Sequence, residues 1–168
     1  MPDTDPIVLE PVTLERMTTG EFTFILLGSA PKVISARSWL GIDAEQATFV
    51  QPSMVVLDAS ERWVCERDLG DPFNCYYIKN KKTGQYLVAG DVDNGCIYLQ
   101  QPDGRRNAKW LIESVSNVHA PMYVKIRNVQ HQNFILANNT GGISERLWLG
   151  LSDDTHSDRW LIRKSSSS

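Results

Sequence analysis

The stretch that decides the fold is RRNAKWLIE, residues 105–113, because two related stretches lie at nearly equal distances on either side of it. ASERWVCER occupies residues 59–67, and HSDRWLIRK occupies residues 156–164. Each copy places a small or polar residue and a charged residue before a tryptophan, and a tail of alternating apolar and polar residues follows. A phrase that recurs at a nearly constant period indicates an architecture built from repeated units.

A second repeated phrase precedes each tryptophan phrase. Its clearer copies are YYIKNKKTGQYLVAG (residues 76–90) and YVKIRNVQHQNFILAN (residues 123–138), and a more divergent copy is FTFILLGSAPKVISAR (residues 22–37). In the clearer copies an alternating stretch ends in a polar turn, and the chain then returns as an apolar stretch. This pattern predicts a β-hairpin in each repeat.

Each repeat also contains a third short strand, at TFV, CIYLQ and LWLGL, so one unit has about four strands. Turn sequences such as KTG, DNG and NNTGG separate the strands, and strong helix signals are nearly absent. Three units are too few for a propeller or a solenoid. The sequence therefore predicts an all-β protein, a β-trefoil with three four-stranded lobes around a pseudo-threefold axis. We expect one domain over residues 1–168, with lobes at 20–68, 74–115 and 121–164, an N-terminal extension at 1–18 and a flexible tail at 165–168.

The tryptophans of the three phrases have a predicted structural role. Trp63, Trp110 and Trp160 are expected to begin the last strand of each lobe and to point into the barrel. Three indoles in one layer would bury a large apolar area in an interior that has no helix to fill it. They therefore bear on the fold rather than on a ligand.

Composition and charge argue against several classes of protein. With 168 residues, 42% of them hydrophobic and 22% charged, the chain has the composition of an ordinary globular domain. A net charge of −3, with no clustering of Lys and Arg, argues against a nucleic-acid partner. No apolar run approaches the ~20 residues that a helix needs to cross a bilayer, so we expect no membrane insertion.

The cysteines and the N-terminal sequence favour a cytoplasmic location. Cys65, Cys75 and Cys96 are odd in number and lack metal-ligand spacing, as expected of free thiols in a reducing compartment. The first residues, MPDTDPIVLEPV, have neither the basic nor the apolar region of a secretory signal. Release from the cell would then need an unconventional route.

The repeated phrases resemble those of the ricin-B-type β-trefoil family. The pattern I-x-N-x-x-(S/T)-G-x-Y-L ahead of the tryptophan phrase, clearest in IKNKKTGQYL of lobe two, carries this resemblance, and NAKW and SDRW are similar to the cytosolic β-trefoil lectins of fungi. Where the family has Gln two residues before Trp, this chain has Glu61, Ala108 and Asp158. The resemblance implies a lectin that binds galactose-type sugars in shallow pockets, at most one per lobe, without catalysis.

By this resemblance, lobe two carries the best candidate sugar site. Asp91 or Asp93 would accept hydrogen bonds from sugar hydroxyls, and Asn94 or Asn107 would add a second polar contact. Tyr98 would stack on the apolar face of the ring. The turn-forming sequence DVDNG also has a purely structural interpretation, which the sequence leaves open.

Lobe three is the second choice, because it combines amides with an aromatic residue but lacks an acid in the same turn. Its candidate residues are Asn138, Asn139 and Trp148. Lobe one offers Trp39 without a nearby carboxylate and is expected to be a poor site. The expected partners are glycans or glycoproteins, and agglutination would need two sites, within one chain or through a homodimer.

The sequence contains no motif for catalysis, a metal or a cofactor, so we expect a protein that is not an enzyme and needs no cofactor. The main alternative is a β-trefoil protease inhibitor, whose partner would be a protease. Its bait would be a basic pair in a predicted turn, either Lys81-Lys82 or Arg105-Arg106. A scaffold for protein interactions is a third alternative. Glycan binding with sugar competition, or stoichiometric protease inhibition, would separate the first two.

Overall fold

A computed structural model describes residues 20–26, 32–36, 48–50, 59–68, 70, 75–90, 97–102, 104, 106–115, 123–137, 144–150 and 159–164. Within these residues, twelve strands are assigned. Lobe one consists of β1 (Phe22–Leu26), β2 (Lys32–Ser35), β3 (Thr48–Val50) and β4 (Trp63–Arg67). Lobe two consists of β5 (Tyr76–Asn80), β6 (Tyr86–Ala89), β7 (Ile97–Gln100) and β8 (Trp110–Val115). Lobe three consists of β9 (Tyr123–Asn128), β10 (Phe134–Ala137), β11 (Ser144–Gly150) and β12 (Trp160–Lys164).

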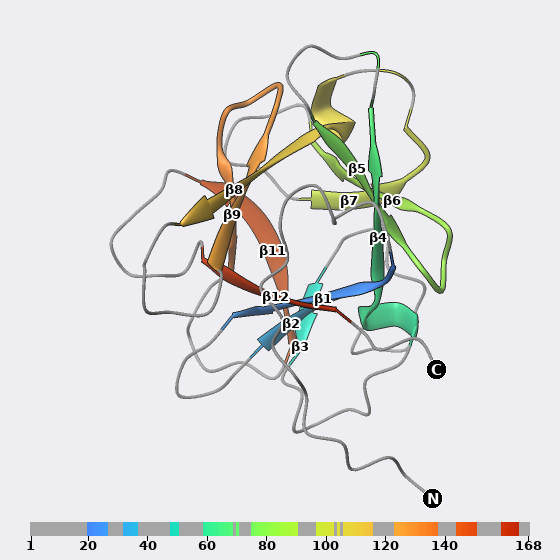
Figure 1. The fold of residues 1–168 in the computed structure, drawn as a ribbon, viewed down its shortest axis with the longest axis vertical. Helices are drawn as coiled ribbons and strands as arrows, with labels where there is room; N and C mark the ends of the chain where they lie inside the picture. The colour runs from blue at the N-terminus through green and yellow to red at the C-terminus, as the bar shows by residue number, and fades with distance from the viewer. Residues whose placement is uncertain are drawn as a thin grey trace, which may run out of the picture.

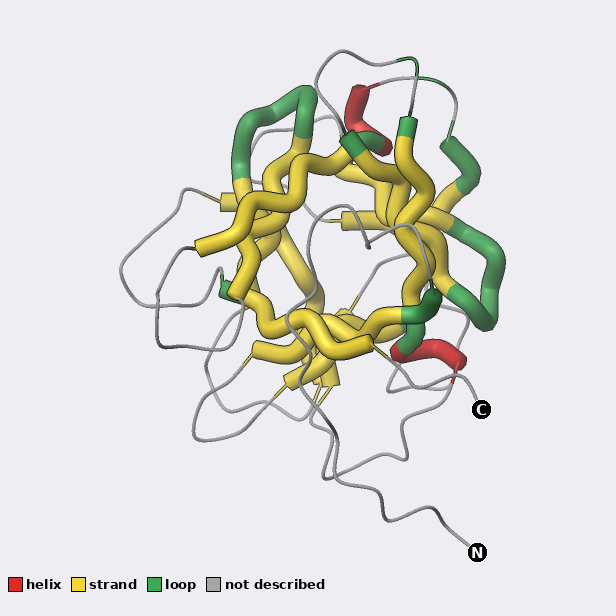
Figure 2. The backbone as a smooth tube through the Cα atoms, viewed as in Figure 1, coloured by secondary structure: helices red, strands yellow, loops and turns green. Residues whose placement is uncertain are grey.

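The first and last strands of the lobes form a closed barrel. β1 pairs with β12, β12 with β9, β9 with β8, β8 with β5, β5 with β4, and β4 returns to β1, all antiparallel. Figure 1 shows the three groups of strands around a central axis, and Figure 2 shows the barrel strands as a ring in the same view. Closure leaves no barrel strand with an unpaired edge.

The second and third strands of each lobe form a hairpin beside this ring. β2 pairs with β3, β6 with β7, and β10 with β11. Each hairpin is joined to the preceding barrel strand, and β11 also pairs with β3 of lobe one. Three lobes, each with two barrel strands and one hairpin, confirm the predicted β-trefoil.

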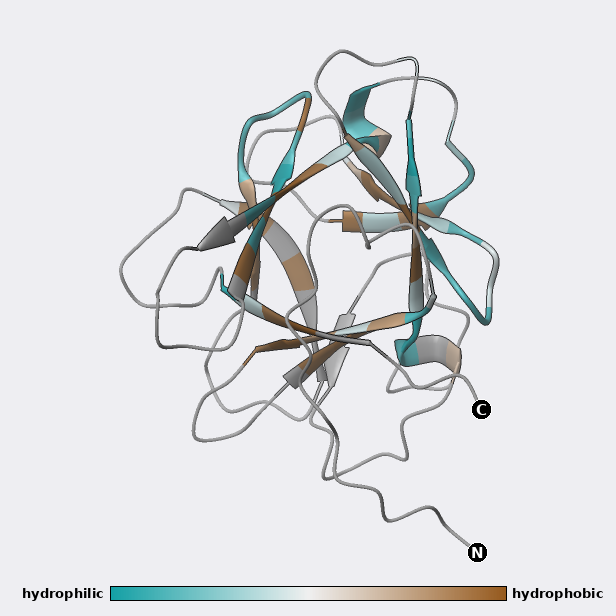
Figure 3. Ribbon diagram, viewed as in Figure 1, coloured by the Kyte–Doolittle hydropathy of each residue, from teal (hydrophilic) through white to brown (hydrophobic). Residues whose placement is uncertain are grey.

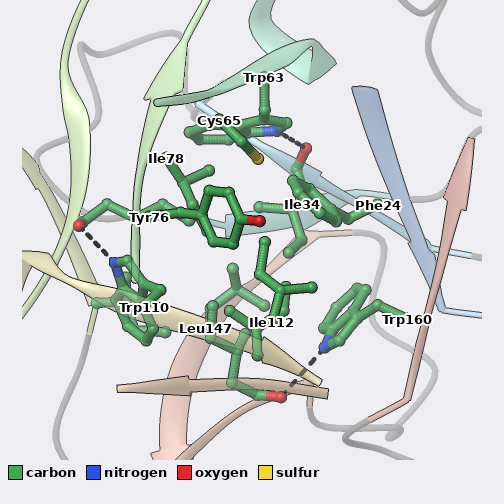
Figure 4. Packing of buried hydrophobic residues seen from close by; sticks show 14 of the residues in the cluster. Phe24, Ile34, Trp63, Cys65, Tyr76, Ile78, Trp110, Ile112, Leu147 and Trp160 are labelled. Atoms are coloured by element: carbon green, nitrogen blue, oxygen red, sulfur yellow. Dashed lines mark hydrogen bonds between the residues drawn. The ribbon is translucent and has the colours of Figure 1, made fainter. Parts of the chain in front are cut away.

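The three tryptophans occupy equivalent positions in the core. Trp63, Trp110 and Trp160 begin the last strands of their lobes, and all three side chains are completely buried, as predicted. Each indole N–H donates to a backbone carbonyl of the second strand of its own lobe (Figure 4). The pairs are Trp63 with Ile34 at 3.0 Å, Trp110 with Leu87 at 2.9 Å, and Trp160 with Ile135 at 3.1 Å. A buried Trp needs such a partner for its N–H.

Two short 3₁₀-helical turns lead into the last strands of lobes one and two, η3 (Ala59–Glu61) and η4 (Arg106–Ala108). Each is closed by a backbone hydrogen bond, from Arg62 N to Ala59 O and from Lys109 N to Arg106 O. The same backbone turn therefore occurs in both lobes, although the residue two positions before the Trp is Glu61 in one and Ala108 in the other. Both of these side chains are completely buried. Figure 3 shows that hydrophilic residues gather in the turns, whereas the strands carry the apolar ones.

Candidate functional site

The lobe-two site predicted from the sequence lies at the corner where β6 ends, β7 begins and η4 contacts β6. Tyr98 lies on β7 opposite Val88, and its side chain is half-exposed. Its neighbours Ile97 and Leu99 are buried, because successive side chains of a strand point to opposite faces. The hairpin therefore directs the Tyr98 ring away from the core. Asp91, Asp93 and Asn94 lie outside the described residues.

Asn107 is built into this corner by η4. Its side chain is 2% exposed, and its amide Nδ2 donates to the carbonyl of Ala89, the last residue of β6, at 3.0 Å. Among the described residues, no donor reaches the buried Oδ1 of Asn107. Leaving such an acceptor without a donor costs about 1–3 kcal/mol, so the position favours a ligand or a water that donates a hydrogen bond. The Nδ2 of this amide thus supports the backbone, and its Oδ1 is a buried acceptor without a donor among the described residues.

A second side chain holds the same end of β6 from lobe three. The Nε2 of His131 lies 2.7 Å from the carbonyl oxygen of Gly90. Because a carbonyl only accepts, this ring nitrogen must carry the proton. Asn128, three residues earlier, accepts the His131 backbone N–H at its Oδ1 and donates from Nδ2 to the carbonyl of Asn107. Lobe three therefore contacts the lobe-two corner through the side chains of both His131 and Asn128.

His131 is not among the candidate residues of the sequence analysis. Its contact with Gly90 joins two positions 41 residues apart. One signal in the sequence marks the position, since His131 is the third residue after Asn128, as Thr83 is the third after Asn80 in lobe two. The signal gives the place in the turn, but only the packed lobes bring the ring to the carbonyl.

Ionic contacts flank η4. Lys109 Nζ lies 2.9 Å from Asp68 Oδ2, and the two side chains are only 14% and 22% exposed. This pair ties the residue before Trp110 to the residue after β4. Since both groups are partly shielded from water, the pair is screened less by salt than an exposed one.

An aromatic and charged cluster lies across the junction of lobes one and two, on β4, β5 and β6. The Tyr86 hydroxyl donates to Glu66 Oε2 at 2.9 Å, and the Tyr77 ring meets Tyr86 edge to face with centroids 6.1 Å apart. Lys79 Nζ lies 5.8 Å from the centre of the Tyr86 ring. Burial, and then the hydrogen bond to Glu66, raise the pKa of Tyr86. The cluster consists of groups that contact one another, and it is separate from the corner of Tyr98 and Asn107.

The candidate residues of lobe three are less fully described. Asn138 and Asn139 lie outside the described residues. Trp148 lies on β11 opposite Leu136, and its strand neighbours Leu147 and Leu149 are buried. The placement of the Trp148 side chain lies outside the description. Trp39 of lobe one also lies outside it.

The basic pairs of the inhibitor alternative occupy two different settings. Lys81 and Lys82 are exposed in the turn after β5, which a hydrogen bond from Gly84 N to Asn80 O closes at 3.0 Å. Lys81 Nζ also lies 3.2 Å from Glu21 Oε1. Arg106 is exposed in η4, and Arg105 lies outside the described residues. A protease binds a substrate-like segment in an extended conformation, so the closed turn that carries Lys81 and Lys82 is poorly suited to inhibition.

The described part of the chain contains no group of three or more His, Cys, Asp or Glu side chains placed to hold a metal ion. None of its helices is long and apolar enough to cross a membrane.

No protein-family model matches the chain, and no curated protein matches its sequence. Its fold is nevertheless shared by solved structures. A Polyporus squamosus lectin bound to the epitope Neu5Aca2-6Galb1-4GlcNAc is 19% identical with a TM-score of 0.67, over 86% of this chain and 49% of that one. The BEL β-trefoil is 12% identical with a TM-score of 0.66, over 87% and 94%. SeviL bound to the asialo-GM1 saccharide is 14% identical with a TM-score of 0.61, over 88% and 99%. At these identities the likeness shows the β-trefoil fold alone.

Proposed function

We propose that the protein is a non-catalytic lectin that binds glycans ending in galactose-type sugars at the corner of lobe two. The observation that carries the proposal is the buried Oδ1 of Asn107, which has no donor among the described residues. It lies on η4, which contacts β6, and the half-exposed Tyr98 is on β7, the strand paired with β6. An amide acceptor and a half-exposed aromatic residue on neighbouring elements suit a sugar, which offers hydroxyl donors and an apolar ring face.

The available groups favour a neutral sugar. The acceptor of Asn107 requires a donor from the ligand, and the carboxylates predicted for this site, Asp91 and Asp93, would repel an anionic ligand. Two of the similar structures carry saccharides, according to their descriptions, and they support carbohydrate binding as a property that this fold can accommodate. Fold alone does not determine function, so the proposal depends on the corner itself.

The first test is a glycan array with the purified protein, followed by calorimetry on the strongest ligand. We expect binding of galactose-terminated neutral glycans and competition by free sugar. Asp91→Ala or Asp93→Ala should abolish measurable binding, because a charge-assisted hydrogen bond of about 1.5–3 kcal/mol is a large part of a weak affinity near −4 kcal/mol. Glu113→Ala, which removes a half-exposed acid on β8, is the matched control and should bind as the parent does.

A second pair of variants tests the stacking role of Tyr98. Tyr98→Ala should weaken binding about tenfold, because an aromatic contact contributes about 0.5–1.5 kcal/mol beyond its buried area. Tyr98→Phe keeps the ring face and should retain most of the affinity. Equal affinity in all the Asp91, Asp93 and Tyr98 variants would show that the sugar binds elsewhere.

Protease inhibition is the alternative outcome of the same experiments. A parent protein that binds no glycan but titrates a serine or cysteine protease stoichiometrically would replace the lectin proposal. The residues to mutate would then be Arg105, Arg106, Lys81 and Lys82.

A further inference from the structure

The end of β6 is held by two side chains that come from outside its hairpin. Asn107 of η4 donates to the Ala89 carbonyl at 3.0 Å, and His131 of lobe three donates to the Gly90 carbonyl at 2.7 Å. Two consecutive peptide groups are therefore held at the point where the chain leaves β6. Since each peptide group is planar, fixing the Gly90 carbonyl also fixes the direction of the bond to the next residue.

Asn128 couples these two side chains. Its Nδ2 donates to the Asn107 carbonyl at 2.9 Å, and its Oδ1 accepts the backbone N–H of His131 at 3.1 Å. Asn128 is completely buried, and its own carbonyl accepts the N–H of Gln132 at 2.8 Å. Through these bonds Asn128 connects the turn that carries His131 to η4, which carries Asn107.

The corresponding turn of lobe two shows that the histidine is not needed to form the turn. Thr83 occupies the same position there, with its backbone N–H donating to Asn80 Oδ1 at 3.1 Å. Its hydroxyl returns to the same Asn80 Oδ1 at 3.3 Å. Thr83 therefore bonds within its own turn, whereas His131 reaches the neighbouring lobe. The difference lies in the side chain alone.

We propose that His131 is a positioning residue for the sugar site of lobe two, so that lobe three controls the affinity of lobe two. This inference rests on the proposed function. By holding the Gly90 peptide in one orientation, His131 reduces the ordering that a ligand would otherwise have to impose on the corner. The corner that carries Asn107 is then ordered before the sugar arrives.

The test compares four variants by calorimetry with a galactose-terminated glycan and by hydrogen exchange of the segment 86–98. His131→Leu and His131→Asn lack a donor at the position of Nε2, whereas the longer His131→Gln retains one. The first two should weaken binding about fivefold to tenfold, corresponding to one lost hydrogen bond, and should speed exchange in the segment. His131→Gln should restore both properties toward the parent values. Thr83→Val, the matched control in lobe two, should change neither.

Each result has a defined consequence. Parent-like affinity and exchange in both His131→Leu and His131→Asn would overturn the proposal. Losses in His131→Gln as large as those in His131→Leu would assign the residue a packing role instead. A parent protein that binds no glycan would refute the lectin function, but the exchange rates of the variants would still decide whether His131 orders the corner. Near-UV circular dichroism of the buried tryptophans checks that each variant is folded.

Discussion

The turns at 80–85 and 128–133 share one backbone and differ in what their side chains do. In each, the Asn N–H donates across the turn to the residue five positions later, and its carbonyl accepts from the residue four positions later. In each, the Asn side-chain oxygen accepts the N–H groups two and three positions later. Asn80 and Asn128 are both completely buried, whereas the donors of these bonds belong to exposed or half-exposed residues of the turn.

The two turns diverge at the third and fourth positions after the Asn. Lobe two has Thr83 and Gly84, whereas lobe three has His131 and Gln132. Gly84 and Gln132 both have positive φ, 70° and 62°. The Asn thus determines the backbone of the turn. The third and fourth positions after it can carry different side chains, and they differ between the two lobes. The repeat preserves what the backbone requires and leaves the remaining positions available for function.

The largest effect is expected from removing the shared Asn. Asn80→Ala or Asn128→Ala should each lower the free energy of unfolding by about 2–4 kcal/mol, because two backbone N–H groups of the turn lose their acceptor and the completely buried side chain leaves a cavity. Urea denaturation of both variants measures the loss. Asn128→Asp keeps the acceptor of the turn but sets a buried carboxylate oxygen against the Asn107 carbonyl oxygen, so it should cost at least as much as the Ala variant. A loss under about 0.5 kcal/mol in either Ala variant would show that the turns do not depend on the Asn in the same way.

A smaller effect is expected at the position with positive φ. Gly84→Ala should lower the free energy of unfolding by about 1–2 kcal/mol, the cost of the left-handed conformation for a residue with a Cβ. A Cβ at this position would meet no atom within 4 Å, so a steric clash adds nothing. Gly84→Asn tolerates this conformation better and should cost less. Thermal and urea unfolding measure the stability of both variants. A Gly84→Ala variant as stable as the parent would contradict the strain assigned to this position.

The smallest effect is expected when a residue of lobe two is replaced by the residue that lobe three has at the equivalent position. Tyr86 of lobe two and Phe134 of lobe three are equivalent, since each lies opposite a basic residue of the preceding strand, Lys79 or Arg127. Phe134 is 8% exposed, and Arg127 Cζ lies 4.8 Å from its ring centre. Tyr86→Phe should therefore change the free energy of unfolding at neutral pH by less than about 0.5 kcal/mol.

The same variant has a pH signature. Burial raises the pKa of Tyr86 in the folded protein above the value of about 10 of an unfolded chain, so at alkaline pH the unfolded state loses this proton first. Stability linked to Tyr86 is therefore complete below about pH 10 and decreases as the pH rises above it. Urea denaturation at pH 7 and pH 10.5 should show a larger loss for the parent than for Tyr86→Phe. Equal losses would mean that the hydroxyl keeps its unfolded pKa.

The candidate site was predictable from the sequence only in part. The alternation of β7 predicted strand residues, and Tyr98 is half-exposed between buried Ile97 and Leu99. Asn107 was expected as a sugar contact, but its Nδ2 donates to the Ala89 carbonyl, and its Oδ1 is buried without a donor among the described residues. The sequence placed Asn107 just before the Trp110 strand. The hydrogen-bond partner of its Nδ2, the carbonyl of Ala89, lies 18 residues away on β6 and follows only from the packing.

The sequence by itself determined the β-trefoil, because hydrophobic alternation, turn residues and three tryptophan phrases are local properties that repeat along the chain. Burial of Trp63, Trp110 and Trp160 followed from that repetition. Only the tertiary structure decided how the lobes contact one another. The bond from His131 to Gly90 joins residues 41 positions apart, and no pattern of neighbouring residues encodes it. Such a contact arises when barrel closure brings the turn of one lobe against the hairpin of another, and a hydrogen bond requires its two atoms to lie within about 3 Å.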